Sequence, residues 1–246
     1  MINQDKQFEH RLEVFRTEEQ SGTQFFYAFL AIKAIISDNT KIRKAVNETP
    51  MFWATNLAAL QTAFFITLGR IFDQKSKYNI NSLLRFAQEN KTIFSKDALA
   101  ERKRKDSLNA DEWLEDYLKR SYEPMADDFR RLKGYVGKYR KIYMANYQKI
   151  RHKLYAHKEW SDVVSIKKQF RKTRIRELER LFIFLNQLYE ALWELFHNGR
   201  KPVLRPMRYS INMIRKRRKP ALDESTIQEQ MVNDVKDFFN LLLRKK

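Results

Sequence analysis

The sequence predicts an all-α fold, and three observations support this prediction. The 246 residues include only 5 Gly and 5 Pro, which is too few for a turn-rich β fold. Apolar residues recur at intervals of three or four along most of the chain, the spacing that places them on one face of a helix. No stretch shows a convincing strand pattern. We therefore expect an up-and-down bundle of long helices, followed by an additional C-terminal helix.

Two helices are expected at the start of the chain. The first covers residues 3–20, where aromatic and aliphatic side chains share one face. The pair Ser21-Gly22 is expected to end it. The next helix covers 23–37, and its many Phe, Ile and Leu residues predict that most of it is buried.

A third helix is predicted to begin at Thr49-Pro50, because Thr can cap a helix and Pro suits the first helical position. It continues to about residue 72. Residues 51–69 carry no charge, which is also typical of a membrane span, but five polar Thr, Asn and Gln side chains interrupt this stretch. We therefore expect a helix buried in a protein core and no contact with a membrane. A short helix follows within 79–90.

The second half of the chain is expected to contain three longer helices. Residues 95–119 are highly charged, and within them the run 101–106 favours a solvated helix face over a specific RNA contact. A long helix lies within 121–158, and another covers 171–197 and ends at Asn198-Gly199. An amphipathic helix then covers 224–243.

The chain is strongly basic, and the charge is uneven. The 49 Lys and Arg residues exceed the 30 Asp and Glu residues, for a net charge of +19. Residues 1–100 contribute +3 and residues 101–246 contribute +16. A charge of this size predicts attraction to nucleic acid or another polyanion. The absence of Cys excludes disulfides and thiol catalysis, and together with a polar N-terminus it leads us to expect a cytoplasmic protein.

The chain is expected to divide into a helical domain, residues 1–198, and a tail, residues 199–246. Within the tail, residues 199–220 hold nine Lys or Arg, no acid and three of the five Pro residues. This basic stretch is either an arm that follows a phosphate backbone or a solvated connector. The C-terminal amphipathic helix is expected to pack on the bundle or on a partner.

A short motif near the end of the long helix combines a cation with a group that moves protons. Arg151 can bind a phosphate through two parallel hydrogen bonds, and His157 can transfer a proton near neutral pH. Six residues on a helix correspond to about 9 Å of rise and about 120° of rotation, so the two side chains are neighbours. A structural interpretation stays open, in which His157 stabilises a helix end and Arg151 pairs with Glu159 or Asp162.

The run from Arg151 through His152 to the pair Ala156-His157 resembles the signature of the HEPN superfamily of all-helical ribonucleases. It is most similar to the abortive-infection U-like branch, in which an Ala-His pair commonly closes the motif. The run from Leu68 to Asp73, followed by Ser82-Leu83, also resembles that branch. The resemblance covers roughly residues 5–197 in helix order. It departs from the family pattern at His152, where Asn or Asp is more usual.

The resemblance implies a metal-independent endoribonuclease that needs no cofactor. His157 would act as general base or acid, Arg151 would stabilise charge on the phosphoryl oxygens, and His152 would orient one of them. It also implies a homodimer with the site at its interface, a role in prokaryotic defence or as a toxin, and an inhibitor or antitoxin protein. Basic residues beside the motif and in the tail are candidate RNA contacts: Lys149, Lys153, Lys158, Arg215, Lys216, Arg217 and Arg218.

Two other functions are compatible with the sequence: a non-catalytic module that binds RNA, and a helical interaction protein. No Gly-rich phosphate loop, nucleophile elbow or His–carboxylate cluster at ligand spacing is present, so nucleotide hydrolysis, serine hydrolysis and metal binding have no support. His10 and His197 are expected to be surface or core residues. Arg70 and Asp73 are expected to form a helix-end ion pair more readily than to position the site.

Overall fold

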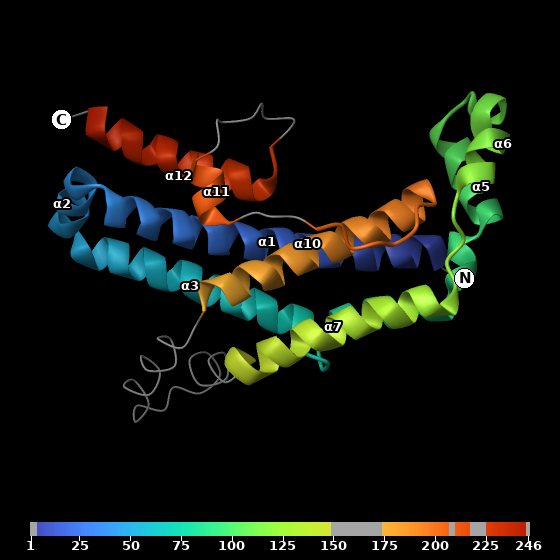
Figure 1. Cartoon of the computed structure of the whole chain (residues 1–246), viewed down its shortest axis with the longest axis horizontal. Helices are drawn as coiled ribbons and strands as arrows, with labels where there is room; N and C mark the ends of the chain where they lie inside the picture. Colours follow the sequence, from blue (N-terminus) through green and yellow to red (C-terminus); the bar gives the residue numbers. More distant parts are fainter. Residues whose placement is uncertain (1–3, 149–173, 207–209, 217–224, 245–246) are drawn as a thin grey trace. The chain divides into compact units, whose positions relative to one another are not determined.

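The structure is a computed structural model that describes residues 4–148, 174–206, 210–216 and 225–244. Within these ranges the regular elements are all helical, which confirms the predicted fold class (Figure 1). The elements are α1 (Gln4–Asp38), α2 (Thr40–Glu48), α3 (Pro50–Phe72), α4 (Ile80–Glu89), the short 3-10 helix η1 (Lys91–Phe94), α5 (Lys96–Asp106), α6 (Ala110–Arg120), α7 (Ala126–Asn146), α10 (Ile175–Asn198), α11 (Ile211–Lys216) and α12 (Ile227–Arg244).

The first two predicted helices are one continuous helix, so the break expected at Ser21-Gly22 is wrong. Gly22 lies inside α1, where a Cβ atom would come within 2.8 Å of Phe182 and 2.9 Å of Thr67. The glycine therefore marks a close approach of neighbouring side chains, and not a helix end. Sequence spacing alone does not distinguish these two uses of glycine.

The chain forms two compact units, each built from three separate stretches. The first unit comprises Met1–Thr17, Arg70–Ala145 and Ile183–Met207. The second comprises Glu18–Gly69, Asn146–Phe182 and Arg208–Lys246. The division at residue 198 that the sequence suggested stays a prediction.

The first unit has an aromatic core, and the side chain of Arg102 forms hydrogen bonds beside it. Phe8 packs on Phe94 and Phe196, with ring centroids about 5 Å apart. The Arg102 guanidinium donates to Asp5 at 2.8 Å and to the backbone oxygens of Ile93 and Phe196 at 2.9 Å. Arg102 therefore joins three stretches that are far apart in the sequence.

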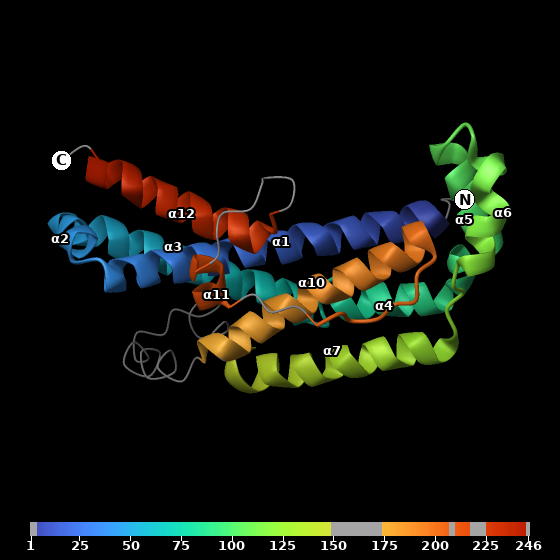
Figure 2. The same cartoon turned by 45° about the horizontal axis from the view of Figure 1, so that its top comes forward.

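Helices α5 and α6 of the first unit lie side by side, as two views show (Figure 2). Asp128 fixes the start of α7 by accepting hydrogen bonds from the Met125 backbone N–H at 3.0 Å and the Tyr122 hydroxyl at 2.7 Å. Burial raises the pKa of this carboxyl, but hydrogen bonds from Tyr122, Met125 and Arg131 outweigh it, so the net pKa is lowered. The start of α7 is thus held by a charged and buried acid.

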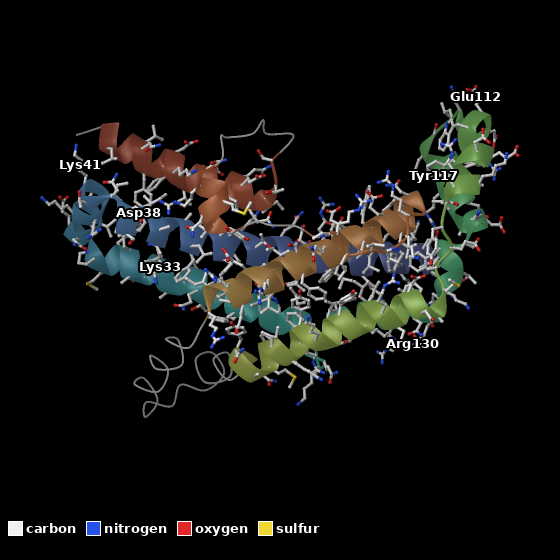
Figure 3. The ribbon with its side chains drawn as sticks, viewed as in Figure 1. Lys33, Asp38, Lys41, Glu112, Tyr117 and Arg130 are labelled. Carbon is white, nitrogen blue, oxygen red and sulfur yellow. The ribbon has the colours of Figure 1, made fainter. Side chains whose placement is uncertain are left out.

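The second unit has an aromatic core and an apolar cluster. Phe26 stacks on Phe182 at 4.9 Å in the core. The cluster comprises the buried residues Ile35, Ile42, Val46 and Phe239. Trp53 stacks on Phe239 at 5.4 Å. Figure 3 labels Lys33, Asp38 and Lys41, which belong to the elements around this cluster.

The predicted burial of the third helix is correct only for its second half. Phe64, Phe65, Leu68 and Phe72 of α3 are buried, but Met51 is 83% and Phe52 is 61% exposed. By length and composition α3 could also cross a membrane, a test that a core helix passes as well. Much of its first half is exposed and uncharged, although Trp53 packs against the apolar cluster.

Candidate functional site

The motif residues Arg151, His152 and His157 lie outside the described residues, as do the candidate RNA contacts Lys149, Lys153 and Lys158. The structure does describe the residues that lead into and out of this stretch. The motif follows α7 and precedes α10 in the sequence, and the expectation that the long helix carries it stays a prediction.

Three residues join the end of α7 to the first turn of α10. The Glu177 carboxylate accepts hydrogen bonds from the Asn146 amide at 3.1 Å and from the Tyr147 hydroxyl at 3.2 Å. Tyr147 is fully buried and packs near Phe65, with ring centroids 5.9 Å apart. The pKa of Tyr147 is strongly raised, mainly by burial and also by the nearby Glu177. Its hydroxyl therefore stays protonated and acts as a donor. Asn146, Tyr147 and Glu177 therefore form a stem that joins the described residues on either side of the motif stretch.

The predicted RNA contacts in the tail are described only in part. Arg217 and Arg218 lie outside the described residues, and of Lys216 only its place in α11 is described. Arg215 forms an ion pair with Asp38 at 2.5 Å, and its backbone oxygen accepts a hydrogen bond from Lys236 at 3.2 Å. A phosphate would have to compete with Asp38 for this guanidinium.

Arg70 and Asp73 lie at the end of α3, in the first unit. Arg70 is exposed in the last turn, and the Asp73 carboxylate accepts a hydrogen bond from the Lys75 backbone N–H at 3.0 Å. Asp73 thus shapes the turn that follows the helix.

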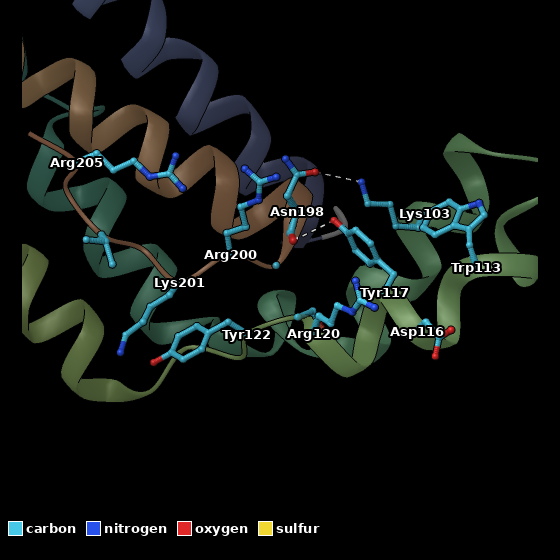
Figure 4. Close-up of a pocket in the computed structure, with 13 residues that line it drawn as sticks. Lys103, Trp113, Asp116, Tyr117, Arg120, Tyr122, Asn198, Arg200, Lys201 and Arg205 are labelled. Atoms are coloured by element: carbon cyan, nitrogen blue, oxygen red, sulfur yellow. Dashed lines mark hydrogen bonds between the residues drawn. The ribbon is translucent and has the colours of Figure 1, made fainter. Parts of the chain in front are cut away.

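A large cavity in the first unit gathers basic and aromatic side chains that the sequence did not single out together. Its volume is about 1090 Å³. We call it the cationic pocket, and its lining residues are Lys103, Trp113, Asp116, Tyr117, Arg120, Ser121, Tyr122, Asn198, Gly199, Arg200, Lys201, Val203 and Arg205. They come from α5, from α6 and the two residues after it, and from the end of α10 and the segment that follows it (Figure 4).

The end of α10 holds the cationic pocket together. Lys103 donates to the Asn198 side-chain oxygen at 3.3 Å, and the Tyr117 hydroxyl donates to the Asn198 backbone oxygen at 3.0 Å (Figure 4). Gly199 has a φ of +56°, a conformation that only glycine adopts readily. The Tyr122 backbone N–H donates to the Gly199 backbone oxygen at 2.6 Å. The chain can therefore reverse closely against α5 and α6.

The charge in the cationic pocket is mostly uncommitted. Five Lys or Arg residues face one carboxylate, Asp116, which pairs with Lys119 at 3.1 Å. Arg200 pairs with Glu194 at 3.2 Å. The other exposed cations of the pocket form no ion pair within the described part of the chain: Arg120, Lys201 and Arg205.

A smaller cavity of about 440 Å³ in the first unit brings together the two His residues that lie outside the motif, His10 and His197. We call it the histidine cavity. Its other lining residues are Lys6, Glu9, Leu12, Glu13, Arg16, Tyr189 and Trp193. Burial first, and then Arg102 and Lys103, lowers the pKa of His197. This imidazole is therefore neutral at neutral pH.

Charge within the histidine cavity is balanced. Two cations, Lys6 and Arg16, face two carboxylates, Glu9 and Glu13. Arg16 donates to the Tyr189 hydroxyl at 3.0 Å. No group of three or more His, Asp or Glu residues that could hold a metal is present among the described residues.

The sequence contains only a weak signal for the cationic pocket. Trp113 and Tyr117 are four residues apart on α6, but the charged residues before and between them are acidic: Asp111, Glu112, Glu115 and Asp116. Aromatic residues of a nucleic-acid surface usually lie among cations. The remaining cations come from a segment about eighty residues later, which no local pattern connects to α6.

Comparison with known proteins gave one match. A family model described as AbiU2, of the HEPN type, matches residues 5–240. Neither the curated proteins nor the solved structures gave a match.

Proposed function

The chain belongs to the AbiU2 family of HEPN domains, and from this membership we propose that it is a metal-independent endoribonuclease. The observation that supports the proposal is the run Arg151, His152 and His157, which lies inside the matched range 5–240. The net charge of +19 also suits a polyanionic substrate.

In the proposed reaction, the 2′-hydroxyl of RNA attacks the adjacent phosphorus. The bond to the 5′ oxygen breaks, which leaves a 2′,3′-cyclic phosphate and a free 5′-hydroxyl. His157 removes or delivers the proton, a role worth about a hundredfold to ten-thousandfold in rate. Arg151 stabilises the negative charge on the phosphoryl oxygens. His152 orients Arg151 or His157 through a hydrogen bond.

The described residues support this proposal in two ways. The stem of Asn146, Tyr147 and Glu177 links the described residues that come before and after the motif stretch. Two chains that each have a net charge of +19 repel each other where their basic surfaces meet. The first half of α3 has no charged residue and has exposed apolar side chains, so it suits contact with a second copy. We accordingly propose a homodimer whose interface completes the site.

The biological role that follows from the family is prokaryotic defence or toxin activity in the cytoplasm. An unrestrained ribonuclease would damage its own cell. We therefore propose that an inhibitor or antitoxin protein, or an infection signal, controls the activity.

The test is cleavage of total RNA and labelled tRNA in the presence of EDTA. The purified protein is compared with a variant that carries Arg151→Ala and His157→Ala. We expect discrete fragments that end in a cyclic phosphate from the wild type alone. Equal cleavage by the variant would show that the motif is not the site.

The cationic pocket favours a second candidate function, RNA binding without catalysis. In that case neither protein cleaves RNA, and both bind it equally. If neither protein binds or cleaves RNA, the third alternative applies, a helical interaction protein.

A further inference from the structure

We propose that the cationic pocket binds a single-stranded segment of RNA. The described lining residues are all distant in sequence from Arg151, His152 and His157, so we treat the pocket as an additional contact for the substrate. The choice of RNA over other polyanions rests on the proposed function. The argument for a nucleic acid site rests on the residues of the pocket.

The size of the pocket suits a piece of polymer. Its volume of about 1090 Å³ exceeds the range of about 300–1,000 Å³ that is usual for small-molecule sites. Its lining residues come from α5, from α6 and the two residues after it, and from the end of α10 and the segment 199–205. More than one nucleotide can therefore be accommodated.

The aromatic residues provide a surface on which bases can stack. Trp113 is 38% exposed, which is high for a large apolar side chain. Its contact with Tyr117 is edge-to-face, with centroids 5.5 Å apart, so the two rings are not stacked on one another. Stacking of bases on such residues is the usual means by which proteins bind single strands.

The cations provide contacts for phosphates. Five Lys or Arg against one carboxylate give the lining a net charge of +4. Arg120, Lys201 and Arg205 have no ion pair within the described ranges, so a phosphate does not have to displace a carboxylate from them. This differs from Arg215, which pairs with Asp38.

The segment 199–205 is held in place before any ligand binds. Its backbone oxygens accept hydrogen bonds from the Tyr122 N–H at Gly199, from Arg131 at Pro202 and from Gln187 at Arg205. With the backbone fixed in this way, binding has to order only side chains, which favours affinity.

An unpaired strand fits these features better than a duplex. The bases of a duplex stack on each other, so their faces are not available to Trp113. An acidic protein segment would use the cations but would gain little from stacking. The contribution of Trp113 therefore separates single-stranded RNA from other anionic ligands.

The experiment measures binding by fluorescence anisotropy in the Arg151→Ala, His157→Ala background, where the RNA is not cleaved. The probes are a labelled single-stranded oligoribonucleotide and an RNA duplex of equal length. One variant carries Arg120→Gln, Lys201→Gln and Arg205→Gln. The matched control carries Lys41→Gln, Lys44→Gln and Lys91→Gln, three exposed Lys residues outside the pocket, and has the same net charge.

Removal of three phosphate contacts should reduce the slope of log K against log salt concentration by about 2, at about 0.7 for each contact with a single strand. The control should keep the wild-type slope. Trp113→Ala should weaken binding of the single strand about tenfold and leave the duplex almost unaffected. Trp113→Phe, which keeps an aromatic ring, should restore most of the affinity.

Equal behaviour of the two triple variants would overturn the proposal, because the binding would then follow net charge alone. Equal loss of duplex and single-strand binding in Trp113→Ala would also overturn it. These outcomes are independent of catalysis. If the wild type does not cleave but the pocket variants lose binding, the pocket stands and the proposed function fails. If the wild type cleaves and the pocket variants bind normally, the proposed function stands and the proposed RNA site in the pocket fails.

Discussion

The cationic pocket and the histidine cavity share several residue types but differ in their balance of charge. The cationic pocket has five cations against one carboxylate, and the histidine cavity has two against two. In the histidine cavity each cation is matched by a carboxylate that lines the same cavity, whereas the lining of the cationic pocket has a net charge of +4. The comparison teaches that a cavity suits a phosphate when its cations outnumber its carboxylates, and not simply because it contains cations.

The largest expected effect concerns which histidines act in catalysis. His157→Ala should reduce RNA cleavage by about a hundredfold to ten-thousandfold, because it removes the proposed general base or acid. A variant with both His10→Gln and His197→Gln should keep most of the activity, since its cavity has no surplus charge for a phosphate. Initial rates on labelled RNA in EDTA measure both. If the His10→Gln, His197→Gln variant loses activity and His157→Ala keeps it, the catalytic histidines lie in the histidine cavity and not in the motif.

A second prediction tests the close packing on which the cationic pocket depends. At Gly199 a Cβ atom would lie 2.6 Å from Leu99 and 2.9 Å from Ser121, at a φ of +56°. Gly199→Ala should therefore destabilise the fold by about 2–4 kcal/mol, from left-handed backbone strain and overpacking. The midpoint of urea unfolding measures the loss.

Gly134→Ala is the matched control, because no atom lies within 4 Å of the added Cβ atom in the middle of α7. It should stabilise the protein by up to about 1 kcal/mol. Equal effects of the two substitutions would contradict the packing described for Gly199.

A third prediction concerns a substitution that adds a carboxylate to the cationic pocket and so brings its charge balance closer to that of the histidine cavity. Val203 lines the pocket and is 51% exposed, so Val203→Glu should place a carboxylate among the cations without disturbing the core. Single-stranded RNA should bind about fivefold more weakly, as expected for one exposed ion pair of up to about 1 kcal/mol. Val203→Gln, of similar size and no charge, should bind like the wild type, and equal weakening would point to a steric effect.

The smallest expected effect is a pH dependence of stability at His197. Because its pKa is lowered in the folded protein, the unfolded chain takes up this proton first as the pH falls below the usual value of 6.5. The folded state therefore loses stability from about pH 6.5 downward, until the lowered pKa is reached. Thermal unfolding at several pH values should show that His197→Gln loses less stability on acidification. A loss equal to that of the wild type would assign the effect to other groups.

The all-α class could be predicted because it depends on local spacing, and the same is true of the starts of α3 and α4. Pro50 suits the first position of α3, and Asn79 caps α4 through a hydrogen bond from the Ser82 N–H at 2.9 Å. Gly22 was misread because its role depends on Phe182 and Thr67, which sequence spacing does not locate. The exposed half of α3 was missed for a related reason, since uniform apolarity indicates burial but does not say what covers the helix.

The motif and the cationic pocket, the two proposed RNA contacts, also differ in whether a sequence pattern can identify them. Arg151 and His157 lie within two helical turns, so a sequence pattern can identify them. The cationic pocket joins Lys103 and Trp113 to Arg200 and Arg205 only when the end of α10 meets α5 and α6. A pattern confined to neighbouring residues cannot predict such a site.

The hydrogen-bond network of Arg102 affects when the protein can fold during its synthesis. This side chain binds Asp5, Ile93 and Phe196, so the network cannot close until Phe196 has left the ribosome. The first unit also needs residues up to Met207, and the second needs the stretch that begins at Arg208. Long-range closure of this kind slows folding and postpones it until most of the chain is synthesised. A nascent chain interrupted before α10 would therefore complete neither unit.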